Sequence, residues 1–158
     1  MAMGAWIAPR ATMDVDVLVH VPKRSHRIVD HVRSSLISRG WSVALYSHEQ
    51  KSIPYRLRAQ TPKGLMIDLI FAPLAIHKRI VEHSQIAPIG KRLRFPVAGP
   101  EGIAVLKLMA GRKQDLIDVE RILAEAELDD ALLLNFAREA KVKQPLMRAA
   151  KRAGWSGG

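Results

Sequence analysis

The stretch RATMDVDVLVHV, residues 10–21, decides how the rest of the chain is interpreted. Val15, Val17 and Val19 occupy alternate positions in it, which predicts a β-strand with one apolar face. Asp14 and Asp16 lie two residues apart on the opposite face, where the strand begins. Neighbouring carboxylates repel each other unless a cation lies between them. The pair therefore predicts either an exposed acidic turn or cap, or two ligands for a hard divalent ion.

The composition indicates a folded domain with a polyanionic partner. The chain has 158 residues, of which 48% are hydrophobic and 25% charged, enough for one core with at most a small helical appendage. The net charge of +10 favours nucleotides, RNA, DNA or an acidic protein as partners, with improved solubility as the alternative explanation. The sequence has no cysteine, which excludes disulfides and cysteine-bound zinc and fits the cytoplasm. We expect no signal peptide and no membrane span.

The order of predicted elements is typical of an α+β fold. After the opening strand, apolar residues at helical spacing predict a helix between Pro22 and Gly40. Strands are then expected at residues 41–47, 53–60 and 65–73, the last two joined by the turn TPKG, followed by a short helix at 74–83. The segment KRLRFPVAGP predicts one more strand, and from Pro100 onward the periodicity is that of four helices. These expectations divide the chain into an α/β core, residues 1–98, and a C-terminal helical region, residues 99–154.

A third acid, Asp68, lies inside the apolar segment LMIDLIF. An ionised carboxylate in such a strand is costly unless it meets a cation or several hydrogen-bond donors. If this strand neighbours the first one, Asp68 joins Asp14 and Asp16, and the three can hold two metal ions that act on a phosphate. The alternative is a structural ion pair with an arginine, for instance Arg10 or Arg112.

Three segments together resemble the nucleotidyltransferase superfamily (polymerase-beta-like). They are RATMDVDVLV, GLMIDLIF and VAGPEGIAVLKLMAGRKQDLIDVERIL, and the resemblance spans most of residues 8–124. Within the superfamily, the chain is most similar to the small prokaryotic branch that includes AbiEii-type toxins. The resemblance implies a small mixed β-sheet core with a C-terminal helical cap. It also implies transfer of a nucleoside monophosphate from an NTP to a hydroxyl of a tRNA, a protein or a small molecule.

The resemblance implies roles for nine residues. Three acids, Asp14, Asp16 and Asp68, would bind Mg²⁺ or Mn²⁺, and Asp68 could also help to deprotonate the acceptor hydroxyl. Nucleotide binding would involve Arg10, Thr12, Lys107, Arg112, Lys113 and Asp115. Lys107 and Arg112 would meet the phosphates, and Asp115 would orient a basic neighbour or touch the nucleotide. On charge pattern alone, a solvent-exposed surface with many ion pairs is the favoured interpretation of these helices.

The sequence departs from the superfamily in one motif. A Gly-Gly or Gly-Ser dipeptide normally precedes the acids and lets the triphosphate approach a helix start closely. Here Gly4-Ala5 is the nearest equivalent, and it lies too near Asp14. Either the reading frame extends upstream, or the chain is a relative that lacks the motif.

Two functions follow from this departure. The first is a nucleotidyltransferase, such as the toxin of a toxin–antitoxin system with a cognate antitoxin as partner. The second is a non-catalytic module that binds RNA or a protein partner.

Overall fold

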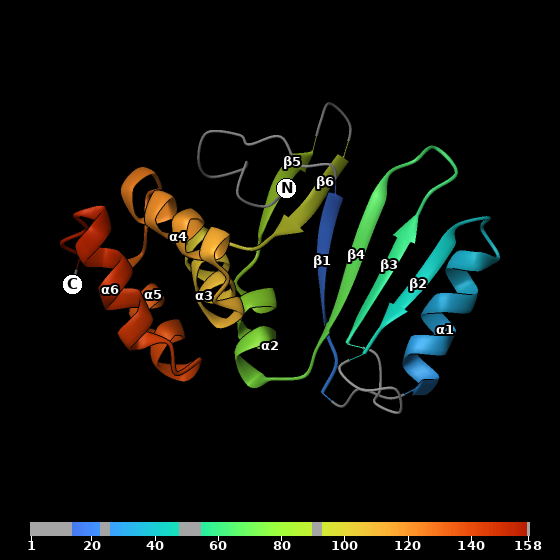
Figure 1. Cartoon of the computed structure of the whole chain (residues 1–158), viewed down its shortest axis with the longest axis horizontal. Coiled ribbons are helices and arrows are strands. Elements are labelled where there is room, and N and C mark those ends of the chain that lie inside the picture. The colour runs from blue at the N-terminus through green and yellow to red at the C-terminus, as the bar shows by residue number, and fades with distance from the viewer. Residues whose placement is uncertain (1–13, 23–25, 48–54, 90–92, 158) are drawn as a thin grey trace. The chain divides into compact units, whose positions relative to one another are not determined.

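The computed structural model describes residues 14–22, 26–47, 55–89 and 93–157. In these residues the chain forms a four-stranded mixed sheet, a two-stranded sheet and six helices, which confirms the α+β class (Figure 1). It divides into two compact units, the described residues 14–78 and 79–157, with the boundary inside helix α2 (Ala75–Glu82). None of the helices in the described ranges is long and apolar enough to cross a membrane.

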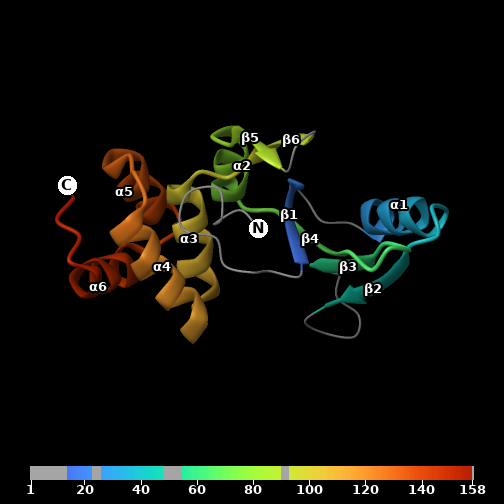
Figure 2. The same cartoon turned by 90° about the horizontal axis from the view of Figure 1, so that it is seen from above.

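The first unit is a sheet covered on one face by a helix. Its elements are β1 (Asp14–His20), α1 (His26–Ile37), β2 (Ser42–Tyr46), β3 (Arg56–Gln60) and β4 (Met66–Ala72). The strand order is β1-β4-β3-β2; β1 runs parallel to β4, and the other pairs are antiparallel. α1 lies along one face of this sheet, as Figure 2 shows. The described part of α1 begins at His26, and its predicted start directly after Pro22 falls on residues 23–25, which lie outside the described residues.

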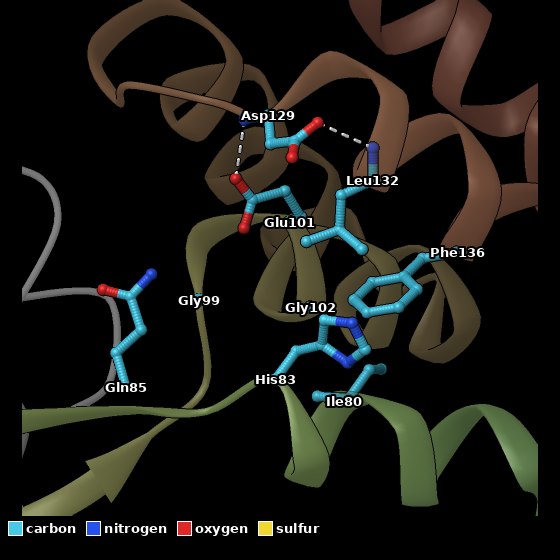
Figure 3. A pocket seen from close by; sticks show the side chains of 9 residues that line it. All are labelled: Ile80, His83, Gln85, Gly99, Glu101, Gly102, Asp129, Leu132 and Phe136. Carbon is cyan, nitrogen blue, oxygen red and sulfur yellow. Dashed lines mark hydrogen bonds between the residues drawn. The ribbon is translucent and has the colours of Figure 1, made fainter.

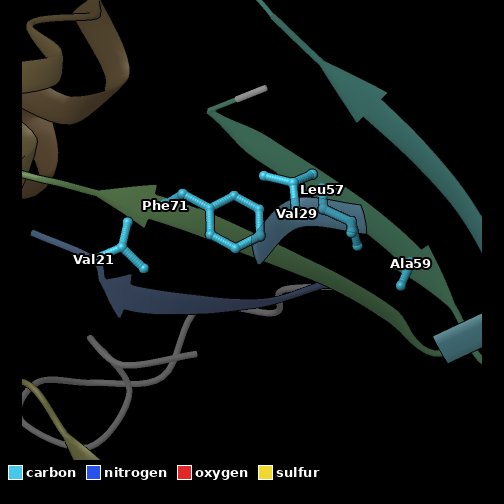
Figure 4. Close-up of a cluster of buried hydrophobic side chains, with 5 residues drawn as sticks. All are labelled: Val21, Val29, Leu57, Ala59 and Phe71. Carbon is cyan, nitrogen blue, oxygen red and sulfur yellow. The ribbon is translucent and has the colours of Figure 1, made fainter. Parts of the chain in front are cut away.

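The core of this unit lies between α1 and the sheet. Its buried members, drawn in Figure 4, come from α1, β3, β4 and the residue directly after β1: Val29, Leu57, Ala59, Phe71 and Val21. Because strand side chains alternate between faces, the residues between these positions on β3 and β4 point to the other face. The packing of α1 therefore assigns Arg56, Arg58 and Asp68 to the face away from that helix.

The second unit contains the hairpin β5 (Gln85–Ile89) and β6 (Leu93–Val97) and most of the helical structure. The helices are α3 (Pro100–Ala110), α4 (Lys113–Glu125), α5 (Asp130–Glu139) and α6 (Lys143–Ala153). α3 contacts each of the other three, and its first six residues are all buried, so it is the central helix of this unit. The sequence pattern predicts β6 but not β5. Each of these strands contains a proline, Pro88 in β5 and Pro96 in β6, and a two-stranded sheet accommodates both because its two strands are edge strands.

Candidate functional site

The sheet brings two of the three predicted metal ligands together. β1 and β4 pair in parallel with Asp16 opposite Asp68 and Asp14 opposite Met66. Residues opposite each other on neighbouring strands point to the same face, and the strands lie about 4.8 Å apart. Two acids from separate parts of the chain thus become direct neighbours. The side chain of Asp14 lies outside the described part of the structure, as do Arg10 and Thr12.

Asp68 is held by two arginines from the neighbouring strand. Arg58 is its register partner on β3 and donates two hydrogen bonds, from Nε to Oδ1 at 2.8 Å and from a terminal nitrogen to Oδ2 at 2.6 Å. A terminal nitrogen of Arg56 lies 3.9 Å from the same Oδ2. The hydrogen bond from Arg58 is the main influence on the pKa of Asp68. With the charges of both arginines it outweighs burial and lowers that pKa below its usual value.

The arginine that pairs with Asp68 is neither of the two that the sequence suggests as examples. Arg112 donates to Asp115 in the second unit, and Arg10 lies outside the described residues. Arg58 forms the ion pair with Asp68 instead. The structure therefore contains both the neighbouring acids Asp16 and Asp68 and an acid–arginine pair. We call Asp16, Arg56, Arg58 and Asp68 the strand cluster.

The strand cluster can supply oxygen ligands to a divalent ion, with one constraint. A carboxylate offers about four acceptor positions, and Arg58 uses two of those on Asp68, one on each oxygen. The remaining positions and the carboxylate of Asp16 are the hard oxygen donors that Mg²⁺ and Mn²⁺ prefer. Among the side chains that the structure describes, which exclude Asp14, no three metal-ligating groups form a cluster.

Arg56 is held by an aromatic contact as well as by charge. Its guanidinium carbon lies 4.2 Å from the centre of the Tyr46 ring, within the range of a cation–π interaction. Its Nε is buried and donates to no acceptor among the described residues. The aromatic ring therefore keeps a second positive charge next to Asp68.

A second set of acids occurs in the helical unit, where α3 ends and α4 begins. Lys107 donates to Asp118 at 2.7 Å and lies 3.5 Å from Asp115. Gln114 donates to the other oxygen of Asp118 at 3.1 Å. Asp115 and Asp118 are both buried, with 3% and 4% of their surface exposed. Lys107, Arg112, Gln114, Asp115 and Asp118 form the group that we call the helix cluster.

Arg112 and Asp115 form the start of α4. The carboxylate of Asp115 accepts hydrogen bonds from the backbone N–H of Arg112 at 3.3 Å and from its Nε at 2.7 Å, an arrangement that caps the helix. Burial alone would raise the pKa of Asp115. The bonds and charge of Arg112, together with the charge of Lys107, outweigh burial and lower that pKa. Lys113 is exposed at the first position of the helix.

The predicted site residues thus fall into two groups, one in each unit. Asp16 and Asp68 belong to the strand cluster, and Lys107, Arg112 and Asp115 to the helix cluster. Sequence reasoning missed Arg56, Arg58 and Tyr46, although the alternation of the two arginines on β3 was visible. Comparison with protein-family models finds no matching family, and comparison with curated proteins finds no relative. The resemblance to nucleotidyltransferases therefore rests on the motifs alone.

Proposed function

We propose that this chain is a metal-dependent nucleotidyltransferase that transfers a nucleoside monophosphate from an NTP to an acceptor hydroxyl. The observation that carries the proposal is the register of β1 and β4, which sets Asp16 directly opposite Asp68. Two carboxylates so placed are electrostatically unfavourable by themselves and suit the binding of Mg²⁺ or Mn²⁺. Asp14 is the third ligand in this proposal.

In the proposed reaction, the acceptor oxygen attacks the α-phosphorus of the NTP. A new oxygen–phosphorus bond forms, the bond from the α-phosphorus to the bridging oxygen breaks, and pyrophosphate leaves. The hydroxyl proton passes to Asp68 or to water. Bound metal ions would supply charge stabilisation at the phosphates. The +10 charge suits tRNA as the acceptor.

The test is label transfer from α-³²P-labelled NTPs, with Mg²⁺ or Mn²⁺, to total tRNA and to lysate proteins. We expect Asp16→Asn to lower the transfer rate at least about 100-fold, because bound metal contributes several kcal/mol and each 1.36 kcal/mol is a factor of ten. Asp30→Asn is the matched control, since Asp30 is an exposed acid on α1 of the same unit. Equal transfer by the Asp16→Asn variant and the unaltered chain would reject the role of Asp16.

One observation favours a second candidate, a non-catalytic module that binds RNA or an acidic protein such as an antitoxin. Both oxygens of Asp68 already accept hydrogen bonds from Arg58, which is what a purely structural acid would show. This candidate predicts RNA binding that weakens steeply with salt and is indifferent to Mg²⁺ and to Asp16→Asn.

Calorimetry with Mn²⁺ and an NTP separates the two candidates. The enzyme predicts nucleotide-dependent Mn²⁺ binding that is lost in Asp68→Asn. The binding module predicts no metal binding in the unaltered chain, in Asp68→Asn or in Arg58→Gln. Arg58→Gln adds information because it removes the guanidinium that uses two of the acceptor positions of Asp68.

A further inference from the structure

A small pocket in the helical unit shares no residue with either acid cluster. It has a volume of about 210 Å³, and the described residues that line it all belong to the second unit. Figure 3 shows it between the end of α2, the start of α3 and the start of α5. Its apolar wall is formed by Ile80, Leu132 and Phe136. Its polar lining includes two carboxylates, those of Glu101 and Asp129, and neither lysine nor arginine among the described residues.

The principal acceptor is Glu101, a buried carboxylate of which 6% is exposed. Its Oε1 accepts a hydrogen bond from the backbone N–H of Asp129 at 2.9 Å, which links the starts of α3 and α5. No hydrogen bond to Oε2 comes from any part of the chain that the structure describes. Oε2 is thus the half of this carboxylate that remains available to a ligand.

Gly99 keeps the space beside Oε2 open. Its φ of −62° and ψ of 162° are allowed for any residue, so its backbone does not require glycine. A Cβ at this position would lie 2.8 Å from Oε2 of Glu101. Glycine is therefore required here by the space beside the Glu101 carboxylate and not by the backbone conformation.

The second carboxylate of the pocket belongs to Asp129, and His83 and the amide of Gln85 complete the polar lining. Asp129 uses Oδ1 to cap α5, accepting from the N–H of Leu132 at 2.9 Å, and Oδ2 adds to the negative charge. Nδ1 of His83 lies 2.8 Å from the carbonyl oxygen of Arg79, which identifies Nδ1 as the donor. Nε2 of a neutral ring is then an acceptor. The lining contains no lysine or arginine among the residues that the structure describes.

The arginine beside the apolar wall is already paired. Arg79 forms an ion pair with Glu139, and its guanidinium lies 5.3 Å from the centre of the Phe136 ring. The pocket is therefore a locally acidic and partly aromatic site in a protein of net charge +10. An anion would find no positive charge to bind in the described lining, and the described side chains form no cluster of three metal ligands.

We propose that this pocket binds an organic cation, an ammonium or guanidinium group on a short apolar stem. The cation would donate hydrogen bonds to Oε2 of Glu101 and to Asp129, and its stem would pack against Phe136 and Leu132. Such a group ends a free polyamine or a lysine or arginine side chain of another protein. The proposal does not depend on nucleotidyl transfer.

The test is titration of the full chain with n-butylammonium and n-propylguanidinium, followed by amide NMR. We expect saturable shifts at Gly99, Gly102 and His83, and no such shifts with n-butyrate. Glu101→Gln keeps an acceptor for the N–H of Asp129 but removes the charge, so affinity should fall at least about tenfold. Glu127→Gln changes the net charge equally at an exposed residue of the same unit and should bind as the unaltered chain does.

No saturable shift with either cation, or full binding by Glu101→Gln, would overturn the proposal and leave Glu101 as a link between helices only. If Glu101→Gln does not fold, Asp129→Asn replaces it, because asparagine also caps helices. A comparison of spermidine with Nα-acetyl-lysine methylamide identifies the source. Tighter binding of the first indicates a polyamine, and tighter binding of the second indicates a protein side chain.

Discussion

The strand cluster and the helix cluster both bury carboxylates, but they pair them in different ways. In the helix cluster the side chains that hold Asp115 and Asp118 come from α3, from α4 and from the turn between them. In the strand cluster an acid of β1 is set opposite an acid of β4, and the cations come from β3. The first arrangement offsets each buried charge with a near neighbour. The second places two acids from distant parts of the chain next to each other, the exposed Asp16 and the buried Asp68, and pairs the buried one with arginines of a third strand.

The largest effect on stability is expected at Asp118. Asp118→Ala would leave Lys107 with the longer contact of 3.5 Å to Asp115, and the Lys107 side chain is just 21% exposed. Removing one partner of a buried pair costs on the order of 3 kcal/mol. Urea denaturation followed by circular dichroism measures this. Glu127→Ala, at an exposed residue of the same unit, should change the free energy of unfolding by less than about 0.5 kcal/mol.

A smaller loss is expected for Asp68→Ala, about 1.5 to 2 kcal/mol, the lower part of the range for hydrogen bonds to charged groups. The side chain of Arg58 is 33% exposed, so the released guanidinium can reach water. The substitution also relieves the repulsion with Asp16. A double-mutant cycle with Arg58→Gln and Asp68→Asn isolates the energy of the pair. A loss at Asp68 that equals the loss at Asp118 would contradict the distinction between the clusters.

The two clusters also differ in how far the sequence predicts them. The three-residue spacing of Asp115 and Asp118 predicts that both lie on one face of a helix, and the structure places them side by side on α4. The partner of Asp68 could have been predicted from the hairpin. The turn TPKG closes with a hydrogen bond from Thr61 to Leu65. Counting outward from that pair along both strands brings Arg58 opposite Asp68.

The register of β1 against β4 could not be obtained in this way. A helix and two strands separate the two in the chain, so no turn fixes which residues face each other. The pairing is set by packing, because the apolar residues of both strands must face α1 together. Sequence alternation therefore predicted the shared face of Asp14 and Asp16, but only the structure shows Asp16 opposite Asp68 rather than two positions along.

Acidification should weaken both clusters. The pKa values of Asp68 and Asp115 are lowered from 3.8 in the folded chain. Each acid thus contributes stability that is fully present above that value and is lost as the pH falls through the lower folded pKa. We expect urea midpoints that hold steady from neutral pH to about pH 5 and fall below about pH 4.

The same titration in Arg58→Gln separates the two contributions. Asp68 owes its lowered pKa chiefly to Arg58, so its share of the pH dependence should disappear in this variant. Asp115 is held by Arg112 and Lys107 in the other unit, and its share should persist. An unchanged pH profile in Arg58→Gln would show that the guanidinium has little influence on Asp68.

The smallest effect is expected at an ion pair that belongs to neither cluster. Arg121 donates to Glu125 one turn away on α4, with Nε 3.2 Å from Oε1, and the two side chains are 33% and 39% exposed. Exposed pairs of this spacing contribute about 0.3 to 0.5 kcal/mol, because water already solvates both charges. Glu125→Gln should therefore shift the urea midpoint barely beyond error, and less so in high salt. A cost near that of Asp118→Ala would mean that the number of ion pairs, rather than their burial, determines the stability of this unit.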